Sequence, residues 1–135
     1  MNYKPNKFAI SIGGFIGPCY SLMLKDEVLL YQVYQAGYEV KAEERINPQE
    51  ASWMQFRTAI DKLDLWSWQA EYADPGVLDG TYWSVEIEFA DKMVKSEGSN
   101  CYPGEGGKPN EYEKGNSFKK FLGAVRKLIG GREFS

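Results

Sequence analysis

Apolar and polar residues alternate through much of the first third of the chain, and this alternation predicts a sheet. In residues 8–12 every second residue is a large apolar one, the pattern of a strand with one buried face. The alternation returns in residues 19–24 and 38–42, and a β-branched and aromatic run occupies residues 28–34. Glycine, proline and charged turn residues separate these segments. We therefore expect four strands in an antiparallel meander.

A helical pattern follows the meander. Asn47 can cap a helix, Pro48 fits its first position, and Glu50 stands three residues past the cap, as in a capping box. Apolar residues then fall on one helical stripe between Trp53 and Leu63. We expect this helix to pack on the sheet.

The second half of the chain predicts a hairpin and a final helix. Residues 83–89 alternate strictly, and a turn at 90–92 leads to a partner strand at 93–97. Residues 98–115 are rich in Gly, Pro, Asn and Glu, which predicts a long loop. From Asn116 or Ser117 onward, apolar positions recur at helical spacing up to Ile129.

The order of elements, ββββαββα, predicts an α+β fold in which two helices cover one face of an antiparallel sheet. The length of 135 residues favours a single domain, residues 1–135. Residues 132–135 depart from the helical pattern. We therefore expect them to be a remnant of cloning and leave them out of the functional interpretation.

Composition removes several classes of function. The chain has no histidine, so catalytic triads and zinc sites that need one are excluded within it. No carboxylate, thiol or glycine spacing matches a known metal, nucleotide or catalytic motif. We expect no catalytic residue, no metal and no cofactor. With a net charge of −3, we also expect neither nucleic acid nor membrane as a partner.

The same composition bears on location. No apolar stretch is long enough to span a membrane, and the N-terminal residues lack the apolar core of a signal peptide. We expect a cytoplasmic protein in which both cysteines are reduced.

Three predicted loops, 15–20, 66–82 and 101–112, hold most residues that neither the strand nor the helix patterns explain. Loops on a rigid scaffold often carry binding sites, so we expect at least two of them to converge on one pocket. Its wall should include Trp66 or Trp68, Tyr82 and one cysteine. The candidate ligand-binding residues are Phe15, Cys19, Tyr20, Trp66, Trp68, Tyr82, Cys101 and Tyr102. A structural interpretation stays open, because large aromatic residues and unpaired cysteines are mostly buried.

Several short segments carry a family resemblance: Phe15, Gly17-Pro18-Cys19, Ser21-Leu22, residues 28–31, and 47–50 before the first helix. With Tyr72 and the final helix, their order resembles a family of small uncharacterised bacterial α+β domains with a Gly-Pro-Cys segment after the first strand. The chain has Ile16 where that family has a further cysteine, and it lacks the proline after Cys19. The resemblance implies a fold but no activity. It is also compatible with an orphan protein encoded by a mobile gene cassette.

These observations favour a small non-catalytic bacterial protein that binds a protein partner or a small molecule through aromatic loops, as immunity or adaptor proteins do. The alternative is a thiol- or carboxylate-dependent enzyme whose site joins Cys19 and Cys101. Residues 28–31 are apolar on both strand faces. This predicts either a central place for their strand or a homodimer contact.

Overall fold

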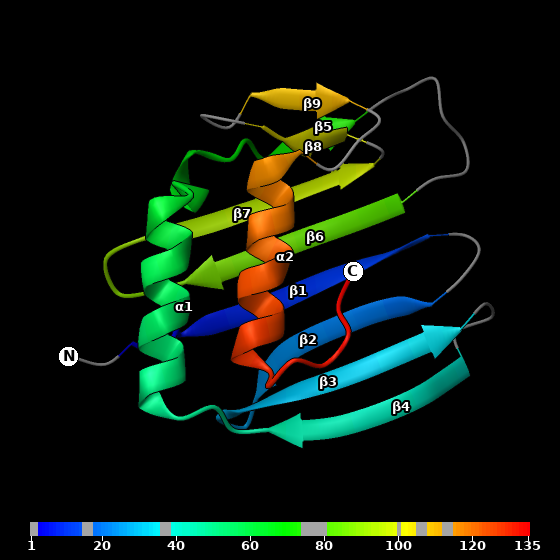
Figure 1. Ribbon diagram of the computed structural model, residues 1–135, viewed down its shortest axis with the longest axis vertical. Coiled ribbons are helices and arrows are strands. Elements are labelled where there is room, and N and C mark those ends of the chain that lie inside the picture. The colour runs from blue at the N-terminus through cyan, green and yellow to red at the C-terminus, as the bar shows by residue number, and fades with distance from the viewer. Residues whose placement is uncertain are drawn as a thin grey trace.

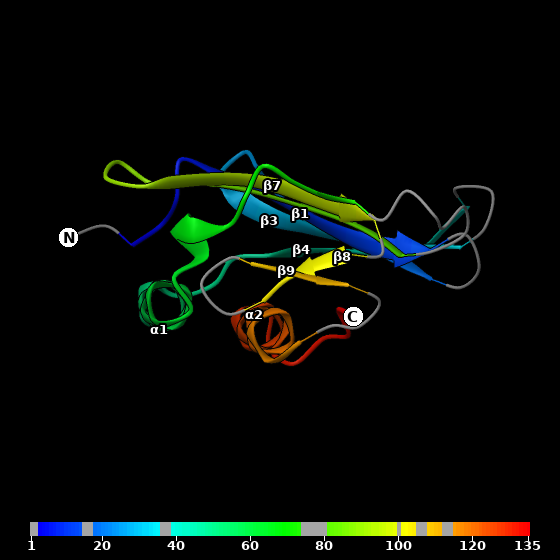
Figure 2. The same cartoon turned by 90° about the horizontal axis from the view of Figure 1, so that it is seen from above.

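The computed structural model describes residues 3–14, 18–35, 39–73, 81–99, 101–104, 108–111 and 115–135. A seven-stranded sheet carries two long helices, α1 and α2, side by side on one face (Figures 1 and 2). The predicted α+β fold, with a mostly antiparallel sheet and two helices, is confirmed.

The strands of the main sheet follow the order β4-β3-β2-β1-β6-β7-β5. They are β1 (Lys7–Gly14), β2 (Cys19–Lys25), β3 (Val28–Gln35), β4 (Glu39–Ile46), β5 (Glu71–Ala73), β6 (Thr81–Glu88) and β7 (Met93–Ser99). Every neighbouring pair is antiparallel except β5 and β7, which are parallel. The short strands β8 (Cys101–Pro103) and β9 (Pro109–Glu111) pair separately. The helices are α1 (Glu50–Lys62), a 3-10 turn at Leu65–Ser67, and α2 (Asn116–Leu128).

The prediction of an unbroken loop over residues 98–115 is wrong. This stretch contains the end of β7 and the strands β8 and β9. Cys101 and Tyr102 of β8 are buried, so tertiary packing determines the backbone there in spite of the many glycines and prolines. The connecting stretch after Trp68 likewise contains β5, whose three residues are too few to give a readable alternation.

The predicted cap at Asn47 is also wrong. Helix α1 begins two residues later, with Gln49 as its N-cap, and no side chain caps it. The first helical bonds run from the amides of Ser52 and Trp53 to the carbonyl of Gln49. Starting there buries Trp53 edge-on against Phe8 of β1.

The core lies between the sheet and the two helices, as the alternation and the helical stripes predict. Every second residue of β1 and β6 faces the helices, and Phe121 of α2 is completely buried. On the same strands the intervening residues face the other side, which no described element covers (Figure 2). Strand β3 lies between β4 and β2 in the sheet, and its residues Leu29 and Tyr31 are buried in the core.

The final residues are part of this packing, although residues 132–135 depart from the helical pattern of the sequence. Phe134 is fully buried, and its ring lies 5.8 Å from that of Tyr20. The Tyr31 hydroxyl donates a hydrogen bond to the Glu133 carbonyl, and Arg126 donates one to the Phe134 carbonyl. The chain end therefore closes the core over β2 and β3.

Candidate functional site

The uncovered face of the sheet is built from small residues at its centre. Ala9 and Ser11 of β1 point to this side, and Ser21 and Ser84 stand beside Ser11 on the neighbouring strands. The hydroxyls of Ser11 and Ser84 lie 2.7 Å apart and share a hydrogen bond. These side chains are shorter than those of neighbouring residues on the same face, such as Met23 and Glu86.

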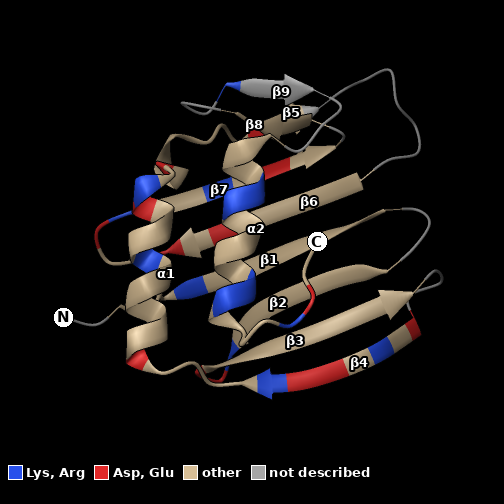
Figure 3. Ribbon diagram, viewed as in Figure 1, with Lys and Arg blue, Asp and Glu red and all other residues tan. Residues whose placement is uncertain are grey.

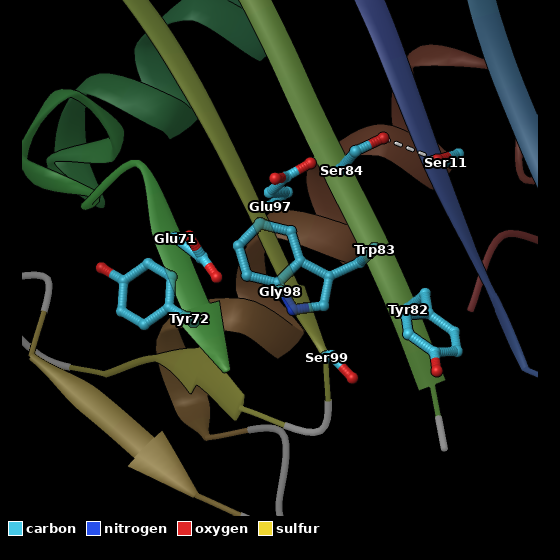
Figure 4. Close-up of a pocket in the computed structure, with 9 residues that line it drawn as sticks. All are labelled: Ser11, Glu71, Tyr72, Tyr82, Trp83, Ser84, Glu97, Gly98 and Ser99. Carbon is cyan, nitrogen blue, oxygen red and sulfur yellow. Dashed lines mark hydrogen bonds between the residues drawn. The ribbon is translucent and has the colours of Figure 1, made fainter. Parts of the chain in front are cut away.

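A depression of about 380 Å³ opens on this face, where β1, β6, β7 and β5 run side by side (Figure 4). Its lining residues are Ser11, Glu71, Tyr72, Tyr82, Trp83, Ser84, Glu97, Gly98 and Ser99. All of them come from strands, so a rigid scaffold positions the site.

Two carboxylates stand next to each other in the depression. Glu71 of β5 and Glu97 of β7 are register partners, and both are exposed. Like charges at neighbouring cross-strand positions are destabilising unless a cation compensates them. Within the described residues neither carboxylate forms an ion pair. The Tyr82 side chain, 52% exposed, adds an aromatic surface beside Ser99.

The floor of this region is held rigidly from the helix side. The Trp83 indole nitrogen donates a hydrogen bond of 3.0 Å to the Cys101 carbonyl. Gly98 makes room for that ring, since a Cβ atom at this position would lie 2.4 Å from the indole nitrogen. The Tyr72 hydroxyl accepts a hydrogen bond from the Gln69 amide, and burial raises the pKa of Tyr72. Its phenol is thus protonated at neutral pH and cannot serve as a base.

Of the predicted aromatic site residues, Tyr82 lines the depression and the others do not. Trp68 is buried and stacks on Phe118 of α2, with ring centres 5.8 Å apart. Trp66 packs edge-on against Phe89, at the opposite end of β6 from Tyr82. Neither Trp66 nor Trp68 therefore lines the depression, and the tryptophan that does so is Trp83.

Two further tyrosine candidates belong to the core. Tyr20 is buried against Phe134, and Tyr102 packs on Phe118 with ring centres 5.0 Å apart. Burial raises the pKa of Tyr102. Both rings stabilise the fold from the helix side of the sheet. The candidate Phe15 lies outside the described residues.

The two cysteines lie on different sides of the sheet. Cys19 is on the uncovered face, where its thiol lies 3.5 Å from the Gly14 carbonyl oxygen. Cys101 is buried on the helix side, below the Trp83 indole. A site that joins the two thiols is therefore wrong on geometric grounds, and neither thiol lines the depression.

Charged side chains elsewhere suggest no second site. Lys119, Lys120 and Lys127 of α2 are exposed, and β4 carries charges of both signs (Figure 3). Among the described residues no three acidic or thiol side chains are grouped closely enough to hold a metal ion. No helix in the described part of the chain has the length and apolar character needed to cross a membrane.

The acidic pair was missed by sequence reasoning for two different reasons. Glu97 is the last residue of the strand predicted at 93–97 and pairs with Ser84 of β6, but the sequence pattern does not show that a second carboxylate lies beside it. Glu71 gives no such signal, because β5 is short and pairs with a strand more than twenty positions further along the chain.

No protein-family model matches the chain, and no curated protein has a similar sequence. The resemblance to bacterial domains with a Gly-Pro-Cys segment accordingly stays a prediction. The geometry of the uncovered face is the basis for any functional interpretation.

Proposed function

We propose that the protein is a non-catalytic binding protein that recognises a partner through the uncovered face of its sheet. In this proposal the depression takes a positively charged group, an amine or a guanidinium. The observation that carries it is the pair of adjacent carboxylates, Glu71 and Glu97, neither of which forms an ion pair within the described residues. A ligand cation between them would relieve their mutual repulsion.

The surroundings of the pair support a cation with an apolar stem. Tyr82 offers a ring face for an alkyl chain or for a cation–π contact. Ser84 and Ser99 offer hydroxyl groups at the floor and rim. The net charge of −3 also favours the approach of a cation. Cys19 and Cys101 lie on different sides of the sheet, which favours this proposal over a site shared by the two thiols.

The test is a titration of the isotopically labelled protein with n-butylguanidinium, followed by amide NMR shifts. We expect saturable shifts centred on Glu71, Tyr82 and Glu97, with a dissociation constant on the order of 1 mM for so small a ligand. Added salt should weaken this binding, because the contact is ionic and exposed.

Three controls make the test specific. The uncharged n-butylurea should bind at least several-fold more weakly. The variant Glu97→Gln should lose most of the affinity, whereas Glu88→Gln, on the same face at the far end of β6, should keep it. Equal binding of both ligands, or equal binding by Glu97→Gln and the parent protein, would contradict the proposal.

A further inference from the structure

The uncovered face has a regular arrangement of charges that follows from the strand register. One row of outward residues begins at Arg45 of β4 and ends at Lys95 of β7, and the residues between them are Leu30, Met23, Ala9 and Glu86. In the end-over-end arrangement described below, Glu86 would face the uncharged Ser84 of the second copy. The next row runs from Glu43 of β4 through Ser21 and Ser11 to Glu97 of β7. On both β4 and β7, a cation in the first row is therefore followed by an anion in the second.

This arrangement is self-complementary under one particular two-fold rotation. Suppose that the uncovered faces of two copies are stacked, and that the two-fold axis lies between them, perpendicular to the strands and midway between the two rows. The second copy is then turned end over end, and each strand lies over the same strand of the other copy. The first row of one copy then meets the second row of the other. Arg45 meets Glu43 of the second copy, and Lys95 meets the acidic pair Glu71 and Glu97.

The other two-fold arrangement of stacked sheets is unfavourable. A rotation about the line of β1, the middle strand, would place Lys7 against Lys7 of the second copy. It would also place β4 over β5, so that Glu43 would meet Glu71. Like charges juxtaposed across an interface cost free energy and exclude wrong pairings. The same rotation would also bring Lys25 of β2 over Glu88 of β6 in the second copy, which is a favourable contact. The end-over-end arrangement places no like charges directly opposite each other in the two rows and is therefore favoured.

We propose that the partner of the uncovered face is a second copy of this chain, bound end over end, with Lys95 as the cation for the acidic pair. This inference rests on the proposed function and identifies its partner. Lys95 is available for the role, since its side chain is 78% exposed and its contact to Glu86 within the chain is long, at 3.7 Å.

The size and relief of the face fit such a dimer. Seven strands about 4.8 Å apart and about seven residues long present roughly 700 Å² per copy, which approaches the area of a standard stable interface. Small residues along β1 let the two sheets approach at the centre. Stacked sheets cross at about 30°, and the long Lys and Glu side chains reach across the resulting offset at β7.

Exposed apolar residues on this face also support a dimer. Met23 is 44% exposed and Met93 60% exposed, and both project from the uncovered side. Val28 of one copy would lie near Tyr34 of the other, because these residues stand at opposite ends of the outward side of β3. A dimer would remove these surfaces from water.

The experiment is analytical ultracentrifugation of the parent protein and charge variants between about 10 μM and 1 mM, at low and high salt. We expect the parent protein to dimerise, more weakly at high salt. Lys95→Glu and Glu97→Lys should each weaken the dimer at least tenfold. The double variant Lys95→Glu/Glu97→Lys should regain it, and an equimolar mixture of the two single variants should form a heterodimer.

A matched control is Lys120→Glu, the same charge reversal on exposed α2, which should leave the dimer unchanged. A parent protein that is monomeric at 1 mM, or single variants that dimerise like the parent, would overturn the inference. The two proposals fail separately. A monomeric protein whose amides at Glu71 and Glu97 still shift with n-butylguanidinium keeps the binding function and loses only the second copy as its partner.

Discussion

At the scale of single residues, two glycines show how differently the same side chain is used. Gly98 lies under the Trp83 ring, where a Cβ atom would be 2.4 Å from the indole nitrogen and 2.6 Å from the Cys101 carbonyl oxygen. Gly123 lies within α2, and the nearest atom to a Cβ there is an Arg126 nitrogen at 3.8 Å. The first glycine is required by packing, and the second only weakens a helix.

Replacing each glycine by alanine should therefore change stability in opposite directions. Gly98→Ala forces Trp83 or β8 to move, and we expect it to lower the free energy of unfolding by about 1–3 kcal/mol. Gly123→Ala should raise it by roughly 0.5–1 kcal/mol. Urea unfolding followed by tryptophan fluorescence measures both. A Gly98→Ala protein as stable as its parent would show that the floor of the depression is not tightly packed.

At the scale of elements, Arg57 joins α1 to the turn between β6 and β7. Its guanidinium donates to both oxygens of Asp91, at 3.1 and 2.8 Å, and to Asp61 on its own helix. It also lies 4.5 Å above the Phe89 ring. Hydrogen bonding from Arg57 holds the pKa of Asp91 below its ordinary value of 3.8.

This link makes a pH-dependent contribution to stability. Because the pKa of Asp91 is lower in the folded state, the unfolded chain takes up the proton first as the pH falls. The contribution is present above the ordinary pKa and is lost as the pH falls through the lower, folded value. We expect Asp91→Asn to melt below the parent protein at pH 7, and the melting temperatures of the two proteins to converge as the pH falls below the ordinary carboxyl pKa of 3.8 and through the lower, folded value. The control is Asp64→Asn, a change at a carboxylate without a described ion pair. The difference between its melting temperature and that of the parent protein should not depend on pH in this way.

The same scale separates what the sequence could predict from what it could not. The alternation in β1 and β6 and the stripes of α1 and α2 are long enough to be read, and these elements form the core. Strands β5 and β8 have three residues each, so their conformation depends on neighbours distant in the chain. The acidic pair consists of one residue from a readable strand and one from a short strand, which is why the site was only half accessible to prediction. Trp68 was misplaced because an aromatic residue near a turn looks the same whether it points outward or inward.

At the scale of the whole molecule, residues 133 and 134 pack against β2 and β3 and close that side of the core. Phe134 is fully buried, so Phe134→Ala should cost about 3–5 kcal/mol, similar to the value expected for Phe121→Ala in the middle of α2. Glu133→Ala is the control, because Glu133 bonds to Tyr31 through its backbone carbonyl and its side chain is not needed. We expect that control to stay within about 0.5 kcal/mol of the parent protein. If Phe134→Ala were as stable as Glu133→Ala and the parent protein, the result would show that residues 133 and 134 contribute little to the core.

The central position of β1 also has a consequence for how the chain folds as it is synthesised. One edge of β1 pairs with β2 at once, but the other must wait for β6, since Phe8 pairs with Ile87. Throughout the synthesis of α1 the nascent meander therefore carries an open edge that can pair with another nascent chain. Native contacts between such distant segments also form slowly. A substitution that delays β6 should thus reduce the yield of folded protein during expression more than it lowers the stability of the molecules that complete folding.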